Sequence, residues 1–185
     1  MPSHDLIPHP SSPQGPLRSI SVDIRLIAPA ALSIRYRVAG SLDGILVPPR
    51  ETPARTDELW RHTCFEAFIG QKGSEAYVEF NFSPSTRWAA YRFTAYREGM
   101  SEAMECPAPA IAVARTASKL TLTSELDLGW MSDGSLDAPL RIALSAVIEN
   151  NAGAKSYWAL AHPSEKPDFH HPDSFVCNLK KASRT

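Results

Sequence analysis

Apolar and polar residues alternate along most of the chain, as in β-strands that bury one face. In residues 20–26, Ile20, Val22 and Ile24 alternate with polar side chains. The same period of two recurs in residues 32–38, 63–69, 77–83, 88–95, 119–128, 141–149 and 156–161. Turn-forming residues separate these segments, and no stretch keeps a helical period over three turns. The sequence therefore predicts an all-β fold, a single antiparallel, jelly-roll-like β-sandwich of about eight to ten strands.

The length of the chain indicates the number of domains, and its net charge argues against some classes of partner. The chain has 185 residues, of which 43% are hydrophobic, enough for one domain with a real core. We expect a flexible lead over residues 1–16, the domain over 17–180 and a frayed tail over 181–185. Nineteen basic and 20 acidic residues give a net charge of −1, which argues against a nucleic-acid or anionic-membrane partner. No signal peptide is visible, so a cytoplasmic location is expected.

Three successive segments send polar and aromatic side chains to one face of the predicted sandwich. In residues 63–69, Phe65, Ala67 and Ile69 form the buried side, and Glu66 points the other way. The same alternation of buried and outward-facing positions extends to the preceding residues and to segments 77–83 and 88–95. The resulting face carries Trp60, His62, Glu66, Tyr77, Glu79, Asn81, Trp88 and Arg92.

This face is unusually rich in hydrogen-bonding and aromatic groups. Consecutive strands tend to be neighbours, and side chains on paired strands lie about 5 Å apart. Glu66 or Glu79 beside Arg92 would form a charge-assisted pair with acceptors left for a ligand hydroxyl group. The pattern favours a concave ligand-binding face, although a solvated face with surface salt bridges remains an open alternative.

A second cluster of candidate residues lies near the carboxyl end. Residues 157–163 include Trp158 and His162, and residues 166–173 include His170 and His171. Segment 163–174 contains three prolines and has no periodicity, so it is predicted to be an irregular loop. Binding groups concentrate in loops held by a rigid sheet, which makes Trp158, His162 and His170 further candidates.

Several of these segments resemble a known family. Residues 58–69, 77–84, 88–93, 157–163 and 166–171 together resemble the bacterial DOMON-like domains, relatives of the family 9 carbohydrate-binding modules. The resemblance implies a β-sandwich whose concave sheet binds a small ligand, such as haem or a sugar. It also implies that Trp60 stacks on a sugar, that Glu66 is the acidic residue of its strand, and that Trp158 is a second stacking residue. The family's aspartate is absent, because His62 and Thr63 occupy that region.

The prediction is therefore a non-catalytic domain that binds a small molecule, with a sugar as one option. Its cofactor and oligomeric state are left undetermined. One alternative is a haem or metal site built from the histidines of the carboxyl-terminal loop, although no spacing matches a zinc signature. The other is an enzyme with a Cys64–His62 dyad, since these residues share a strand face. Cys64, Cys106 and Cys177 are scattered and are read as reduced thiols.

Overall fold

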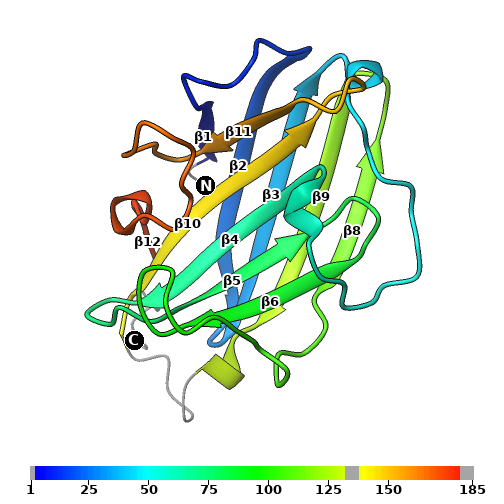
Figure 1. Ribbon diagram of the computed structural model, residues 1–185. Helices are drawn as coiled ribbons and strands as arrows, with labels where there is room; N and C mark the ends of the chain where they lie inside the picture. The colour runs from blue at the N-terminus through cyan, green and yellow to red at the C-terminus, as the bar shows by residue number, and fades with distance from the viewer. Residues whose placement is uncertain (1–2, 132–137, 180–185) are drawn as a thin grey trace.

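Two antiparallel β-sheets pack face to face (Figure 1), as seen in a computed structural model that describes residues 3–131 and 138–179. Twelve strands occur in these residues: β1 (Ser3–Pro8), β2 (Leu17–Ala28), β3 (Ala31–Gly40), β4 (Cys64–Gln71), β5 (Tyr77–Phe82), β6 (Trp88–Phe93), β7 (Ser101–Glu102), β8 (Ala110–Arg115), β9 (Lys119–Asp127), β10 (Leu140–Glu149), β11 (Lys155–Ala159) and β12 (Cys177–Leu179). Four short 3-10 helices connect them: η1 (Leu42–Gly44), η2 (Leu59–Arg61), η3 (Gly129–Met131) and η4 (Pro172–Ser174). The predicted antiparallel β-sandwich is confirmed.

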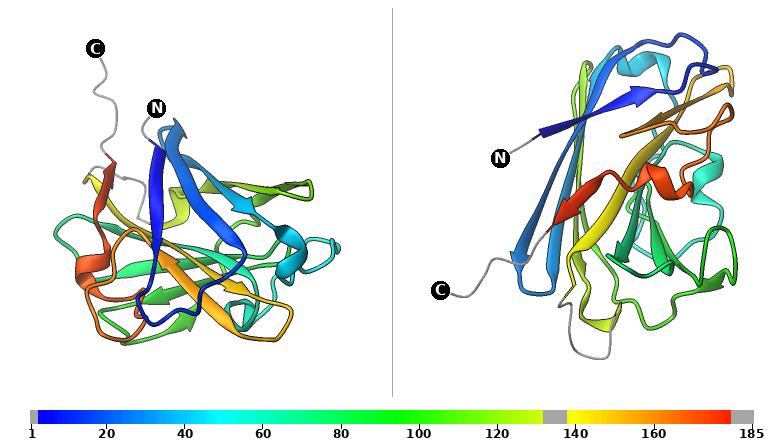
Figure 2. Two further views of the ribbon diagram at one scale, coloured as in Figure 1. Left: turned by 90° about the horizontal axis from the view of Figure 1, so that it is seen from above. Right: turned by 90° about the vertical axis from the view of Figure 1, so that its left-hand side faces the viewer.

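Strand β1 joins the two sheets. Its first part, Ser3 to Leu6, pairs with β2, and its end, Ile7 and Pro8, pairs with β11. The first sheet therefore has the order β8-β9-β3-β2-β1, and the second continues as β1-β11-β10-β4-β5-β6-β7, with β12 paired to β10. Figure 2 shows the two sheets as separate layers.

The strands that the alternation pattern missed are short or exposed. Residues 3–8, which were expected to belong to a flexible lead, form β1 because their backbone pairs on both sides, although Leu6 is the only buried side chain among them. Strand β8 is exposed or half-buried along its length, and β7 has two residues, so neither shows a contrast of apolar and polar positions. The expected tail, 181–185, lies outside the described residues.

The main core lies between the sheets, and a second apolar cluster covers part of the second sheet's other side. The main core is formed by alternating residues such as Ile20 and Ile34 of the first sheet and Phe65 and Phe80 of the second. The second cluster contains Phe68, Tyr77, Ala89, Tyr91, Phe93 and Ala143. Strands β4 and β5 are consequently buried on both faces, so loops must cover the outer face of the second sheet. No described helix is long and apolar enough to cross a membrane.

Tyr36 links the two sheets directly beneath this covered face. Its side chain is fully buried in the main core, and its hydroxyl group donates a hydrogen bond of 2.7 Å to the backbone oxygen of Glu66. The bond fixes the first sheet against the centre of β4.

We expect Tyr36→Phe to lower the free energy of unfolding by about 1–2 kcal/mol, because the variant keeps the ring but removes a buried hydrogen bond. Urea denaturation followed by tryptophan fluorescence measures the change. Tyr157→Phe is the control, since no hydrogen bond of its hydroxyl group is found among the described residues. Equal stability of Tyr36→Phe and the unmodified protein would contradict the role of this bond.

Candidate functional site: a cavity on the outer face of the second sheet

A cavity of about 470 Å³ opens on the outer face of the second sheet. Its floor includes Glu66 and Glu79, and aromatic rings of Trp60, Tyr157 and Phe169 contribute to its walls. The full lining is Trp60, Arg61, Glu66, Glu79, Phe93, Arg97, Met100, Val147, Lys155, Tyr157, Pro167, Phe169 and His170. A small cavity with apolar walls and a few polar groups has the usual anatomy of a small-molecule site.

Strand register brings the two carboxyl groups of the floor together. Glu66 of β4 lies opposite Asn81 of β5 on one side and opposite Ser145 of β10 on the other. Glu79 is two residues from Asn81 and therefore points to the same face. Both glutamates are almost completely buried, with exposed fractions of 3% and 6%.

Side chains of the same face hold these carboxyl groups. Asn81 Nδ2 donates to Glu79 Oε1 at 2.8 Å, and Ser145 Oγ donates to Glu66 Oε2 at 3.2 Å. The Cys64 thiol in turn donates to Asn81 Oδ1, with an S···O distance of 3.5 Å. These bonds form two separate groups on the floor: Cys64, Asn81 and Glu79 in one, and Ser145 and Glu66 in the other.

Burial dominates the electrostatics of the floor. Desolvation raises the pKa of Glu66 well above its usual range, and the neighbouring charge of Glu79 raises it further. Desolvation also raises the pKa of Glu79, to about 7, although the Asn81 hydrogen bond and the charge of Arg97 oppose this rise. Burial therefore disfavours the ionised form of each carboxyl group, and the repulsion between them disfavours ionisation of both at once.

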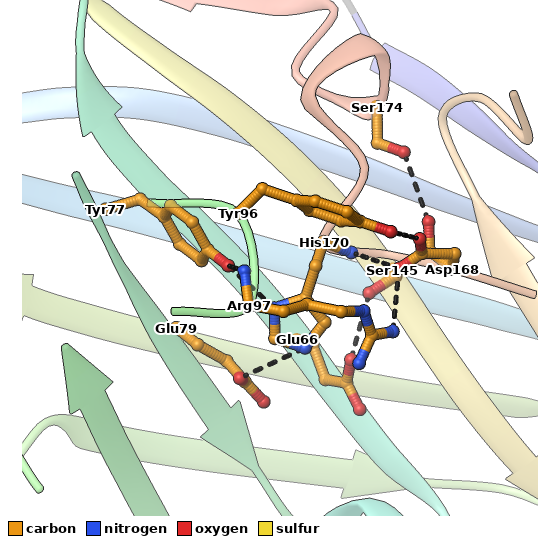
Figure 3. A network of polar contacts seen from close by, with 9 residues as sticks. All are labelled: Glu66, Tyr77, Glu79, Tyr96, Arg97, Ser145, Asp168, His170 and Ser174. Atoms are coloured by element: carbon orange, nitrogen blue, oxygen red, sulfur yellow. Dashed lines mark hydrogen bonds and ion pairs between the residues drawn. The ribbon is translucent and has the colours of Figure 1, made fainter. Parts of the chain in front are cut away.

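A clasp between two loops positions His170 over the sheet (Figure 3). Asp168 accepts hydrogen bonds from the Tyr96 hydroxyl group at 2.5 Å, from Arg97 Nη2 at 2.7 Å and from the His170 backbone N–H at 3.2 Å. The clasp thus ties the loop after β6 to the irregular loop before η4. The His170 ring lies at its end, with Nδ1 2.9 Å from the Tyr77 hydroxyl oxygen and Nε2 3.6 Å from Glu79 Oε2.

The opposite wall is built by η2. Trp60 packs its ring edge against Tyr91, with ring centroids 5.7 Å apart, and the Tyr91 hydroxyl group donates to Asp57. Glu58, just before η2, and Arg97 in the clasp have left-handed backbones, with φ of 59° and 56°. Such conformations cost free energy in residues other than glycine, so the surrounding contacts must hold each backbone in place.

The structure gathers six of the predicted candidates around this cavity. Trp60, Glu66, Glu79 and His170 line it, while Tyr77 and Asn81 bond to His170 and Glu79 from beside them. The parity argument for β4 and β5 is therefore correct.

The prediction of which β6 side chains face the cavity is wrong. Trp88 belongs to the main core, with Arg55 stacked on its ring, and Arg92 lies on that same side of the sheet, where it pairs with Glu105 instead of Glu66 or Glu79. Ala89, Tyr91 and Phe93 face the cavity side instead. Tyr91 is the cross-strand partner of Glu79. Because directly paired residues share a face, the register of β5 with β6 places Tyr91 on the cavity side and Arg92 on the core side. The alternation of β6 misleads because apolar residues occupy both of its faces.

Three further candidates lie away from the cavity. Trp158 is in the main core, and its neighbour Tyr157 takes the place in the cavity wall. His62 is exposed and its Nδ1 lies 2.7 Å from Glu149 Oε2, while His162 Nε2 contacts the backbone oxygen of Ile7 at 2.9 Å. Each histidine is held by groups at the margins of the sheet.

Other lining residues were missed by sequence reasoning. Arg97 and Met100 lie in the loop after β6, which has no periodicity to reveal its direction. Phe169 lies in the predicted irregular loop 163–174, where the candidates were chosen among the histidines. A signal for Tyr157 did exist: it neighbours Trp158 in the strand, and only one of two consecutive residues can face the core.

The structure does not bring Cys64 and His62 together as a dyad. Cys64 is fully buried, and desolvation raises the pKa of its thiol well above the usual range, which disfavours the thiolate. Its hydrogen-bond partner is Asn81, whereas His62 is engaged by Glu149. Among residues 3–131 and 138–179, no three His, Cys, Asp or Glu side chains gather closely enough to hold a metal ion.

Comparisons with known proteins concern the fold. No family model and no curated protein matches the sequence. A candidate carbohydrate-binding protein from Bacteroides uniformis matches with a TM-score of 0.69 and 16% identity, covering 95% of this chain and 84% of that one. Two family 9 carbohydrate-binding module structures from Caldicellulosiruptor kristjanssonii also match. The complex with cellotriose has a TM-score of 0.57 at 9% identity and covers 100% and 84% of the two chains; the complex with glucose has 0.52 at 10%, covering 90% and 78%. At such identities the likeness establishes a shared β-sandwich fold.

The raised pKa of Glu79 predicts a pH-dependent stability difference for Glu79→Gln. From the ordinary value of 4.5 up to about 7, the folded protein holds a proton that the unfolded chain releases, so this group's contribution declines as pH rises through that window. Glutamine does not titrate. Between pH 4.5 and pH 8 the variant should therefore gain on the order of 3 kcal/mol relative to the unmodified protein.

Urea denaturation of both proteins across this pH range measures the difference. Desolvation lowers the pKa of His170 to about 4, which changes stability in the opposite direction, but His170 is present in both proteins and its effect largely cancels. A difference that stays constant with pH would contradict the burial of an ionisable Glu79.

Proposed function

We propose that the protein is a non-catalytic carbohydrate-binding domain whose ligand lies in the cavity on the second sheet. The observation that carries the proposal is the position of Trp60 and Tyr157 in the walls of a cavity whose floor holds Glu66 and Glu79. The fold shared with carbohydrate-binding modules supports it. The sequence segments that resemble bacterial DOMON-like domains are consistent with the same ancestry.

The residues match the chemistry of a sugar ring. A pyranose has faces of C–H groups, which pack on aromatic rings, and a rim of hydroxyl groups, which need hydrogen-bond partners. Trp60, Tyr157 and Phe169 supply flat apolar surfaces, and the carboxyl groups of Glu66 and Glu79 supply hydrogen-bonding oxygens. A cavity of about 470 Å³ lies within the size range of small-molecule sites.

A sugar is favoured over haem by the state of His170. Met100 and His170 both line the cavity and are residue types that ligate haem iron. However, Nδ1 of His170 is bonded to Tyr77, and Nε2 faces the Glu79 carboxyl group at 3.6 Å, so an iron atom at Nε2 would have to fit between the ring and that carboxyl group. The two buried carboxyl groups would also lie against an apolar macrocycle, at a high desolvation cost.

Trp60→Ala should abolish the stabilisation of the protein by saccharides. A ligand at 100 times its dissociation constant adds about 2.7 kcal/mol to the stability of the protein that binds it. We expect a thermal-shift screen of neutral mono- and oligosaccharides, including glucose and cellotriose, to find such a ligand. The shift should be absent in the variant because the wall of the cavity is removed.

Arg92→Ala is the control, because Arg92 lies on the other side of the sheet, paired with Glu105. It should keep the full saccharide shift. An unchanged shift in Trp60→Ala, or a lost shift in Arg92→Ala, would place the ligand elsewhere.

A further inference from the structure

The two carboxyl groups of the floor have unequal support for a negative charge. Glu79 accepts a 2.8 Å hydrogen bond from Asn81, and the charge of Arg97 favours its ionised form. Within the described part of the chain, the Glu66 carboxyl group accepts one bond, the longer one from Ser145 at 3.2 Å, and it experiences repulsion from Glu79. Glu66 Oε1 has no hydrogen-bond partner among the described residues, although Glu66 lines the cavity. When one proton is shared between the two groups, these contacts favour its residence on Glu66.

A chain of hydrogen bonds fixes the orientation of His170. The backbone N–H of Arg97 donates to the Tyr77 hydroxyl oxygen at 3.3 Å. Arg97 makes this bond from a left-handed backbone conformation. The single hydroxyl hydrogen of Tyr77 then has one acceptor among the described residues, His170 Nδ1 at 2.9 Å. Tyr77 has an exposed fraction of 4%, and protonation of Nδ1 would leave this hydrogen without an acceptor among the described residues.

These contacts favour the tautomer of neutral His170 that carries its hydrogen on Nε2, which faces Glu79. Desolvation and the charge of Arg97 lower the pKa of His170 to about 4, so the ring is neutral at physiological pH. The Nε2···Oε2 distance of 3.6 Å is longer than a hydrogen bond, but the N–H dipole still points toward the carboxylate. His170 consequently adds to the support for a negative charge on Glu79.

The remaining charged groups around the floor do not reverse this asymmetry. Arg97 is paired with Asp168, and Arg61 is paired with Glu58. Lys155 lines the cavity but has no ion pair with either carboxyl group. Cys64 retains its proton, because burial raises the pKa of its thiol.

We propose that the chain from Arg97 through Tyr77 to His170 holds Glu79 as the ionised acceptor while Glu66 stays protonated as the donor. The floor then offers one acceptor and one donor, which fits two neighbouring hydroxyl groups of a neutral saccharide. One hydroxyl group donates to Glu79, and the other accepts from Glu66. The saccharide assignment rests on the proposed function, whereas the protonation pattern does not.

NMR of the protein without ligand tests the protonation pattern directly. With ¹⁵N-labelled histidine between pH 6 and pH 8, His170 should show a protonated Nε2 and an unprotonated Nδ1. With ¹³C-labelled glutamate, the Glu79 carboxyl signal should titrate at a lower pH than that of Glu66. A protonated Nδ1, or a Glu66 carboxyl group that ionises first, would overturn the proposal.

Tyr77→Phe tests the hydrogen-bond chain. The variant keeps the ring but removes the donor to Nδ1, so His170 should become a mixture of both tautomers and the Glu79 titration should move to higher pH. Tyr157→Phe makes the same chemical change in the cavity wall and should leave the His170 tautomer unaltered. A single Nε2–H tautomer in Tyr77→Phe would show that Tyr77 does not set it.

Two isosteric variants connect the pattern to binding. Glutamine resembles a protonated glutamic acid, so Glu66→Gln retains a donor, whereas Glu79→Gln loses the charged acceptor. With the neutral saccharide that gives the largest thermal shift in the screen, calorimetry should show at least a tenfold greater loss of affinity for Glu79→Gln. Equal losses, or a greater loss for Glu66→Gln, would overturn the assignment. If no saccharide binds, the proposed function fails, and the NMR measurements still decide the protonation pattern.

Discussion

The pairing of β4 with β5 and β10 is the constraint on which the cavity depends. It places Glu66 between Asn81 and Ser145 and puts Glu79 beside them on the same covered face. Burial of two carboxyl groups is costly, so the hydrogen bonds from Asn81 and Ser145 are needed to keep them there. A shift of β4 by one residue against its neighbours would turn Glu66 into the main core and separate it from Glu79, which lies on β5.

Strands and irregular loops supply different parts of the cavity. The strands fix the floor, while η2 brings Trp60 to one wall and the Asp168 clasp brings His170 to the other. The clasp ties together two loops that are far apart in sequence, and β11 adds Tyr157 to the cavity wall. The same clasp holds Arg97, whose backbone N–H reaches Tyr77.

The extent to which sequence predicts this structure differs between its parts. Period-two alternation identified the β-sandwich and the faces of β4 and β5, because each of those strands presents a distinct apolar side to the main core. It failed for β6, where Tyr91 and Phe93 pack under loops, so that both faces are apolar. It could not place Arg97 or Phe169, since the direction of a loop side chain depends on tertiary contacts rather than on periodicity.

The indole N–H signals of the four tryptophans test the central claim most directly, because these residues sample separate regions of the protein. Trp60 lines the cavity, Trp88 and Trp158 are in the main core, and Trp130 stacks with Arg92 on the other side of the second sheet. In a ¹H–¹⁵N NMR titration with a saccharide found by the thermal-shift screen, the Trp60 signal should move strongly and the other three should stay near their positions. A saccharide-induced shift centred on Trp158 or Trp130, with Trp60 unmoved, would contradict the account.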